Sequence, residues 1–219
     1  MAGDDDRPPP PTLDRVQAFS DGVFAIAITL LILPLTDAQV RDGHVVEDLL
    51  ALQHQFLALA LSFAVVGRFW LLHHDDLAMM TSAGRRMLVA NLVFLFFIVL
   101  LPFPTALLGD GDSAAATMIY ALALIATSLS GLAVWWSAER DGVVRGERAV
   151  RWGRGKYWGT AAVVVGFLPT FPLALLSPMW ARISWALVVP LSLLADRIEE
   201  RRRPQDGSSR RSRHSTAAQ

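Results

Sequence analysis

Residues 15–35, "RVQAFSDGVFAIAITLLILPL", decide the fold class, because they form an apolar run long enough to cross a bilayer. A membrane-spanning helix needs about 20 such residues, and between positions 22 and 35 the only polar side chain is Thr29. Ser20 and Asp21 nevertheless stand just inside the start of the run. A charged side chain in lipid costs roughly 3 kcal/mol on insertion scales. Asp21 is therefore expected to face a partner or a cavity.

Further apolar segments indicate that the whole chain is a membrane protein. Hydrophobic residues make up 53% of its 219 residues, which is high for a soluble domain. The pattern predicts an all-α membrane protein with six transmembrane helices at 16–35, 50–72, 87–108, 114–137, 157–176 and 178–195. Only Ser177 separates the last two segments, and both contain prolines. A broken or re-entrant pair is the alternative for them.

The distribution of positive charge predicts the topology. With the N-terminus in the cytoplasm, all but two of the 20 lysines and arginines fall on the cytoplasmic side, and the exceptions are Arg41 and Arg182. The N- and C-termini are therefore both predicted to be cytoplasmic. The predicted organisation is a disordered tail over 1–14, a six-helix transmembrane domain over 15–196, and a disordered basic tail over 197–219.

Catalytic and metal-binding motifs are missing from the sequence. There is no cysteine, which excludes disulfides and thiolate metal sites. His73 and His74 are adjacent, so on a helix they point about 100° apart and do not chelate as a pair one turn apart would. We therefore expect no enzyme activity, no metal site, no cofactor and no nucleic-acid partner.

The sparse polar side chains of the first three predicted helices share one depth, in the cytoplasmic third of the membrane. They are Ser20, Asp21, Arg68, His73, His74 and Asn91. A pair between Asp21 and either Arg68 or a histidine would offset the cost of the buried carboxylate. Two interpretations stay open: a brace that fixes the packing of the bundle, and a site that supports a gate or senses protons.

Four residues of the first helix share one face, since Ile26, Thr29, Leu30 and Leu33 are spaced i, i+3, i+4 and i+7. The helix is apolar all round, so its periodicity alone fits a packing face as well as a pore wall. Six helices leave little room for a pore within one subunit. Any pore is therefore expected on a symmetry axis between subunits.

The stretch "RVQAFSD" resembles the R-x-x-x-F-S-D signature of the transmembrane protein 175 family, the potassium channels of endosomes and lysosomes and their bacterial relatives. The matching residues are Arg15, Phe19, Ser20 and Asp21. The stretches "RFWLLHHDD" and "NLVFLFFIVLLPFPT" resemble the second and third helices of that family. The resemblance covers about residues 15–105.

This resemblance implies a potassium-permeable cation channel with modest selectivity for K⁺ over Na⁺, permeable to other monovalent cations as well. It implies that the first helix lines the pore, with constrictions at Ile26, Leu30 and Leu33 and with the hydroxyl of Thr29 facing the ions. A chain with one six-helix repeat implies a homotetramer. A ring of isoleucines implies a hydrophobic gate that opens when it becomes wet.

The resemblance also implies that Ser20 and Asp21 anchor the first helix to the second and third, with Arg15, His73 and Asn91 as partners. We add Arg68 and His74 to this network because of their depth. The arginine-rich, lysine-poor composition indicates a bacterial protein, and hence a multi-pass protein of the plasma membrane. A secondary transporter and a non-conducting membrane scaffold are the alternative functions.

Overall fold

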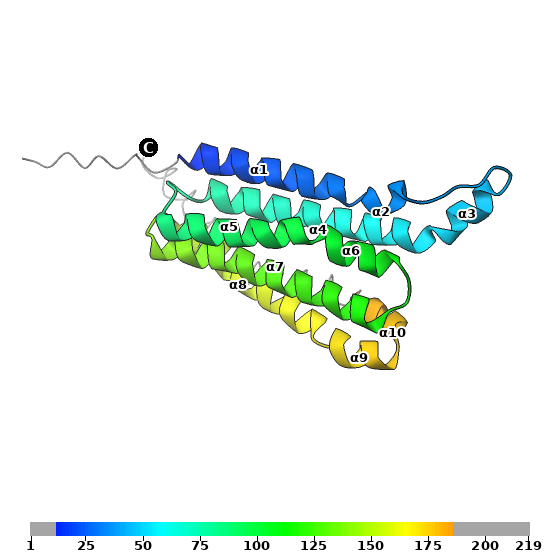
Figure 1. The fold of residues 1–219 in the computed structure, drawn as a ribbon. Helices are drawn as coiled ribbons and strands as arrows, with labels where there is room; N and C mark the ends of the chain where they lie inside the picture. The colour runs from blue at the N-terminus through cyan, green and yellow to red at the C-terminus, as the bar shows by residue number, and fades with distance from the viewer. Residues whose placement is uncertain (1–11, 186–219) are drawn as a thin grey trace, which may run out of the picture.

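The structure is a computed structural model that describes residues 12–185, and this part of the chain forms a bundle of helices aligned along one long axis (Figure 1). The helices are α1 (Leu13–Leu30), α2 (Leu33–Thr36), α3 (Val45–Ala51), α4 (Gln53–Ala78), α5 (Arg85–Leu100), α6 (Pro102–Gly109), α7 (Ala114–Arg140), α8 (Glu147–Phe167), α9 (Thr170–Leu176) and α10 (Pro178–Ser184). Within the described residues there is no strand, only an isolated bridge between Met80 and Val144.

Five stretches of the described chain are long and apolar enough to cross a membrane, where the sequence predicted six. They are Leu13–Thr36, Gln53–Ala78, Arg85–Gly109, Ala114–Arg140 and Glu147–Leu176. Of the predicted sixth segment, only the short helix α10 is described, and residues 186–195 lie outside the described part. The predicted tails lie outside it too, except that α1 begins at Leu13.

Prolines interrupt three of the five spans, because a proline offers no N–H to the helical ladder. α1 gives way to α2 just before Pro34, α5 to α6 at Pro102, and α8 to α9 at Pro169. Leu33 was predicted to share a continuous helix with Ile26, but it begins α2. The linking residues Leu31 and Ile32 keep right-handed helical backbone angles, so the direction of the chain changes little.

The second span is longer than predicted and includes the whole "HHDD" stretch. α4 runs to Ala78, whereas the sequence predicted an end near position 72. The added turn is amphipathic, since His73, Asp76 and Leu77 are buried while His74 and Asp75 are exposed. Tertiary contacts on this buried face hold the helix beyond the apolar run.

α7 occupies the middle of the bundle, with α5 and α6 on one side and α8 and α9 on the other (Figure 1). Its Tyr120 and Trp135 are almost completely buried. The hydroxyl of Tyr120 lies 3.0 Å from that of Ser62 on α4, and Thr105 Oγ1 of α6 lies 2.8 Å from the same Ser62 oxygen. These hydroxyls satisfy one another inside an apolar core, which ties three helices together.

The end of the bundle that carries most of the arginines is closed by two interlocking connections. The α4–α5 connection meets the α7–α8 connection where Thr81 N–H donates to the carbonyl of Val143 at 2.9 Å. Asp141 Oδ2 accepts from the backbone N–H groups of Arg86 and Met87, at 3.0 and 3.1 Å. α5 therefore receives its N-terminal cap from a distant residue, since Gly84 at the cap position has no side chain.

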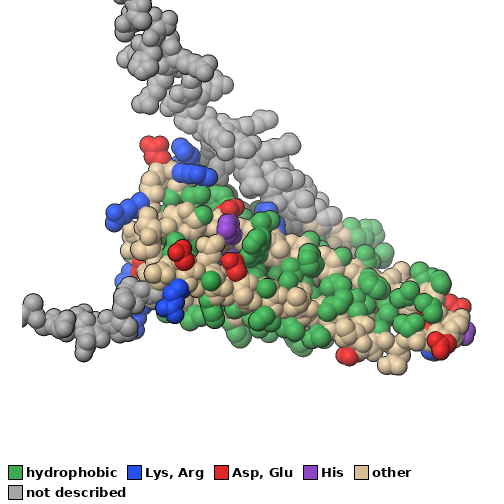
Figure 2. Space-filling model, turned by 90° about the horizontal axis from the view of Figure 1, so that it is seen from above, with side chains coloured by type: hydrophobic (Ala, Val, Ile, Leu, Met, Phe, Trp, Pro, Cys, Tyr) green, Lys and Arg blue, Asp and Glu red, His purple; other side chains and the backbone are tan. Residues whose placement is uncertain are grey.

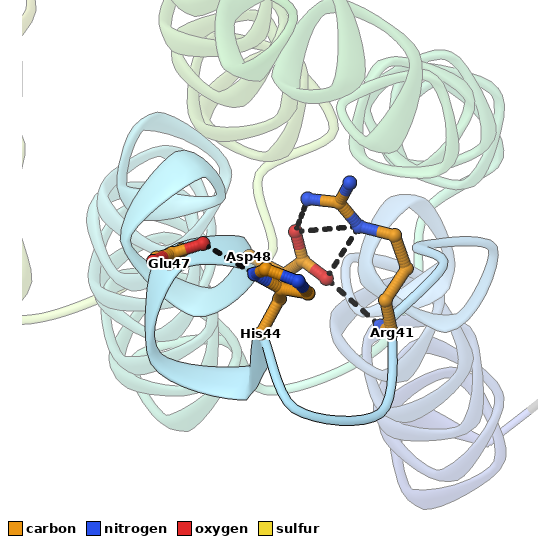
Figure 3. Close-up of polar contacts among 4 residues, drawn as sticks. All are labelled: Arg41, His44, Glu47 and Asp48. Carbon is orange, nitrogen blue, oxygen red and sulfur yellow. Dashed lines mark hydrogen bonds and ion pairs between the residues drawn. The ribbon is translucent and has the colours of Figure 1, made fainter.

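The opposite end carries a loop between α2 and α3 that an ion pair shapes (Figure 3). Arg41 donates to Asp48 from its backbone N–H at 2.8 Å and from Nη2 at 2.6 Å. His44 Nδ1 lies 2.7 Å from Glu47 Oε2 in the first turn of α3. The hydrogen bonds from Arg41 lower the pKa of Asp48 below its usual 3.8. The pair therefore stabilises the folded loop at neutral pH, and this contribution is lost as the pH falls through the lowered pKa.

α8 packs closely on α7 at Gly153, and this contact gives a testable prediction. A Cβ atom at Gly153 would lie 3.0 Å from Glu139 Oε1 and closer still to the ring of the buried Trp135. Gly153→Ala should therefore cost about 1–3 kcal/mol through overpacking, which exceeds the gain of about 1 kcal/mol in helix propensity. Gly159→Ala is the matched control on the same helix, because nothing lies within 4 Å of its Cβ. Thermal unfolding in detergent should rank Gly153→Ala below the wild type and Gly159→Ala; equal midpoints would contradict this packing.

Candidate pore helix and polar seam

α1 presents two different faces. Its buried face, which includes Phe24 and Ala27, packs on α4 and α5. The predicted pore residues lie mostly on the other face: Ile26 is 61% exposed and Leu33 is 51% exposed. Thr29 is exposed as well, and Leu30 is half-buried. Three of the four residues that the spacing grouped together thus remain uncovered by the described part of the subunit.

A polar seam holds the start of α1 against its neighbours. Asn91 Nδ2 of α5 donates to Ser20 Oγ at 3.1 Å, and both residues are almost completely buried. Asp21 Oδ1 accepts from the indole Nε1 of Trp70 on α4 at 2.8 Å. The carboxylate thus has a neutral partner, whereas the sequence predicted Arg68 or a histidine. Arg68 itself is exposed, two residues from Trp70 and on a different side of α4.

His73 sits beside this seam among aromatic rings. Its imidazole centroid lies 5.0 Å from the ring of Phe94 on α5 and 5.9 Å from the ring of Phe24 on α1. His73 is 3% exposed, and its Nε2 has no hydrogen-bond partner in the described structure. The residue that the sequence assigned to a polar network therefore packs mainly as an aromatic ring between three helices.

The remaining predicted network residues lie at the edges of the seam. His74 Nδ1 lies 3.2 Å from Gln17 Nε2, which joins α4 to α1 a turn below Asp21. Arg15 and Phe19 are exposed on α1. The structure thus joins Ser20 to Asn91, packs His73 on the aromatic rings of Phe24 and Phe94, and gives the two exposed α1 residues no part in these contacts.

Two contacts at this end of the bundle were missed by sequence reasoning. The first is Trp70, although its position one turn before His73 and His74 placed it on a suitable face of the helix. The second is the buried Asp76 of α4, which forms an ion pair with Lys156 of α8 and accepts from Trp152 Nε1 at 2.8 Å. Lys156 is the only lysine of the chain. This rarity was the one sequence feature that could have indicated a special role for it.

The geometry supplies no arrangement for metal chemistry within the described residues. No group of three histidine, aspartate or glutamate side chains there is placed to hold a metal ion. Figure 2 shows hydrophobic side chains along the molecule, with lysine and arginine gathered toward one end. Long apolar helices, breaks at prolines and a polar seam between the first three spans define a multi-pass membrane protein.

Comparison with known proteins shows which family the first half of the chain resembles. Residues 15–102 match the model of a family described as endosomal/lysosomal potassium channel TMEM175. A Streptomyces collinus protein named as a potassium channel is 37% identical over 134 residues, which cover 58% of this chain and 65% of the relative. A Danio rerio protein named endosomal/lysosomal proton channel TMEM175 is 36% identical over 143 residues, or 28% of its length. Over its first three spans the chain is therefore similar to the TMEM175 family.

A solved structure extends the similarity to the later helices. The crystal structure of a lysosomal potassium-selective channel TMEM175 homolog from Chamaesiphon minutus aligns with a TM-score of 0.68 at 27% identity, over 84% of this chain and 97% of that one. The sequence alignments are shorter and span less than two thirds of the curated relatives named above. The shared fold therefore reaches beyond the segment that the family model matches.

Proposed function

We propose that the protein is a potassium-permeable cation channel of the bacterial plasma membrane, with its arginine-rich end in the cytoplasm. The observation that carries the proposal is the exposed face of the first span, which presents Ile26, Thr29 and Leu33. The family match includes this helix, and Ile26 stays 61% exposed on it although the opposite face is packed on α4 and α5. Relatives named as potassium channels support the choice of ion.

The pore forms on the axis of a homotetramer, where four copies of α1 face one another. Ile26 and Leu33 then make apolar rings, with Leu30 between them. Narrow apolar rings exclude water and so stop ions until the helices separate, which is gating by dewetting. The polar seam that joins Ser20 to Asn91 and Asp21 to Trp70 braces the base of α1 during this movement.

Selectivity in such a pore is modest, because this face offers few oxygen atoms to a dehydrated ion. Thr29 Oγ1 donates its proton to the carbonyl of Ile26 at 2.8 Å. The lone pairs of the hydroxyl oxygen are thereby left to accept a cation. One hydroxyl per subunit favours the ion that loses water more readily, K⁺ over Na⁺, without the many carbonyl ligands of a dedicated filter.

Single cysteines test this assignment, since the natural chain has none. Ile26→Cys or Thr29→Cys should allow a water-soluble thiol reagent to block potassium flux, because both side chains line the ion path. Ile119→Cys on α7 is the control, as it is also exposed but lies on a helix away from the axis. If the reagent blocks only the Ile119→Cys control, α1 does not line the pore. The same conclusion follows if the cysteines at positions 26 and 29 react with the reagent but the flux does not change.

The brace gives a separate prediction. Asp21→Ala removes the acceptor of the Trp70 indole and should either abolish the assembled tetramer or lock the gate. Trp70→Phe leaves Asp21 without its donor and should cause the same kind of defect in milder form, about 1–3 kcal/mol in stability for an unsatisfied polar group. Size-exclusion chromatography and flux measurements check both. A normal tetramer of Asp21→Ala with wild-type currents would rule out the brace.

A further inference from the structure

The first half of α8 divides its side chains between two faces. Ala149 and Gly153 are buried there, and Thr160 in the second half of the helix is buried on the same side. Their spacing of four and seven residues defines the side that packs on the bundle. Trp152 and Lys156 of the same half-helix reach Asp76 on α4. These contacts fix the rotation of α8 about its own axis, and so determine what its other side presents.

The other side carries three arginines, Arg148, Arg151 and Arg154, all of them exposed. Arg151 lies 3.9 Å from Glu147, a loose pair because the glutamate side chain is 95% exposed. Within the described part of the chain, no carboxylate is in ion-pair contact with Arg148 or Arg154. α8 engages acidic side chains of other helices through other residues, Asp76 through Lys156 and Glu139 through Tyr157. We name these three residues the arginine face.

With the stretch Glu147–Leu176 spanning the bilayer, the arginine face falls at the depth of lipid headgroups. Immediately after it, the exposed Tyr157 and Trp158 open the apolar part of α8, and such residues favour the membrane interface. From Arg148 to Arg154 the helix rises about 9 Å, which is close to the roughly 5–8 Å of headgroup region in one leaflet. Val150 is 55% exposed between the arginines, so the surface combines cationic and apolar contacts.

We propose that the arginine face binds anionic phospholipid of the cytoplasmic leaflet, of the phosphatidylglycerol class. Guanidinium groups donate paired hydrogen bonds to phosphate, and clusters of arginines beside a span attract acidic lipids. The exposed aromatic and aliphatic neighbours supply contact for the acyl chains. The lipid would bind to α8, and the ion pair between Lys156 and Asp76 joins α8 to α4, the helix that carries Trp70 and His73. The binding itself does not depend on the proposed channel activity.

Quenching of tryptophan fluorescence by brominated lipid tests the proposal on the purified full chain in nonionic detergent. Brominated phosphatidylglycerol should quench at lower concentration than brominated phosphatidylcholine, and added salt should weaken only the former. The variant R148Q/R151Q/R154Q should bind phosphatidylglycerol about tenfold or more weakly. The variant R148K/R151K/R154K, which retains the charge but not the paired donors, should bind more tightly than the glutamine variant and more weakly than the wild type.

The matched control R210Q/R211Q/R213Q removes the same three charges from the C-terminal segment and should bind as the wild type does. Loss of binding in this control with none in the α8 variant would move the site to that segment and overturn the proposal. Equal quenching by both lipids would overturn the proposal. The arginines would then only orient the chain in the membrane. Displacement of phosphatidylglycerol by millimolar inorganic phosphate would indicate a site for soluble anions. If the triple glutamine variant does not fold, R148Q and R154Q replace it, each expected to bind several-fold more weakly.

Discussion

Replacing Ile26 by asparagine should raise potassium conductance by about tenfold or more and weaken the discrimination between K⁺ and Na⁺. The side chain is 61% exposed on the uncovered face of α1, so on a four-fold axis it contributes one quarter of an apolar ring. Asparagine has the same number of non-hydrogen side-chain atoms in a smaller volume, and it offers hydrogen bonds to water and ions. A barrier lowered by about 1.4 kcal/mol is enough for a tenfold change in rate, and wetting of a narrow ring acts on that barrier directly.

Ile119→Asn is the control for this experiment, because it makes the same chemical change at an exposed position of α7. Its currents should match those of the wild type. Single-channel recording in planar bilayers separates conductance from the number of open channels. An Ile26→Asn channel with unchanged conductance and selectivity would mean that Ile26 faces lipid and that α1 does not form the constriction.

Neutralising Asp76 should destabilise the protein by about 3–5 kcal/mol, the cost of leaving one member of a buried ion pair alone. Asp76 is 1% exposed and its partner Lys156 is 15% exposed by side chain. Asp76→Asn leaves the ammonium of Lys156 without its counter-charge. The same substitution replaces the charged acceptor of the Trp152 indole N–H by a neutral one. Thermal unfolding in detergent should therefore show a large decrease in the midpoint.

The double variant Asp76→Asn/Lys156→Met should recover much of this loss, because no uncompensated buried charge remains. Glu147→Gln breaks the exposed pair with Arg151 on the same helix and should change stability by less than about 0.5 kcal/mol. A single variant Asp76→Asn as stable as the wild type, or as mild as Glu147→Gln, would show that the pair contributes nothing to holding α8 against α4.

The apolar runs located the five described spans because hydrophobic length is a strong signal in a membrane protein. The start of the fifth was wrong, since α8 begins at Glu147 and not at position 157: its first ten residues are mostly charged or small, and the helix there is held by packing on α7 and α4. Proline positions also predicted the irregular end of the fifth span, where α8 gives way to α9 at Pro169. The end of α4 was placed too early, since residues 73–76 are polar in sequence. Their helix is held by burial of His73, Asp76 and Leu77, which depends on helices far along the chain.

The polar seam was harder to predict in detail. Depth alone placed Ser20, Asp21 and Asn91 in one layer, and the structure joins Ser20 to Asn91. Depth does not give the rotation of α4, however, and that rotation decides whether Arg68 or Trp70 reaches Asp21. The pairing of Asp76 with Lys156 spans 80 residues of sequence, and no local spacing links residues on two helices so far apart.

Ion flux through the wild-type protein is the most direct test of the proposed channel. Purified protein in liposomes loaded with potassium, followed with a proton-sensitive dye and ionophore beside empty liposomes, should show flux driven by K⁺ that exceeds flux driven by Na⁺. The same sample should run as a tetramer. A folded tetramer that passes neither ion would contradict the proposed function and favour a membrane scaffold, and flux that saturates with a specific substrate would favour a transporter.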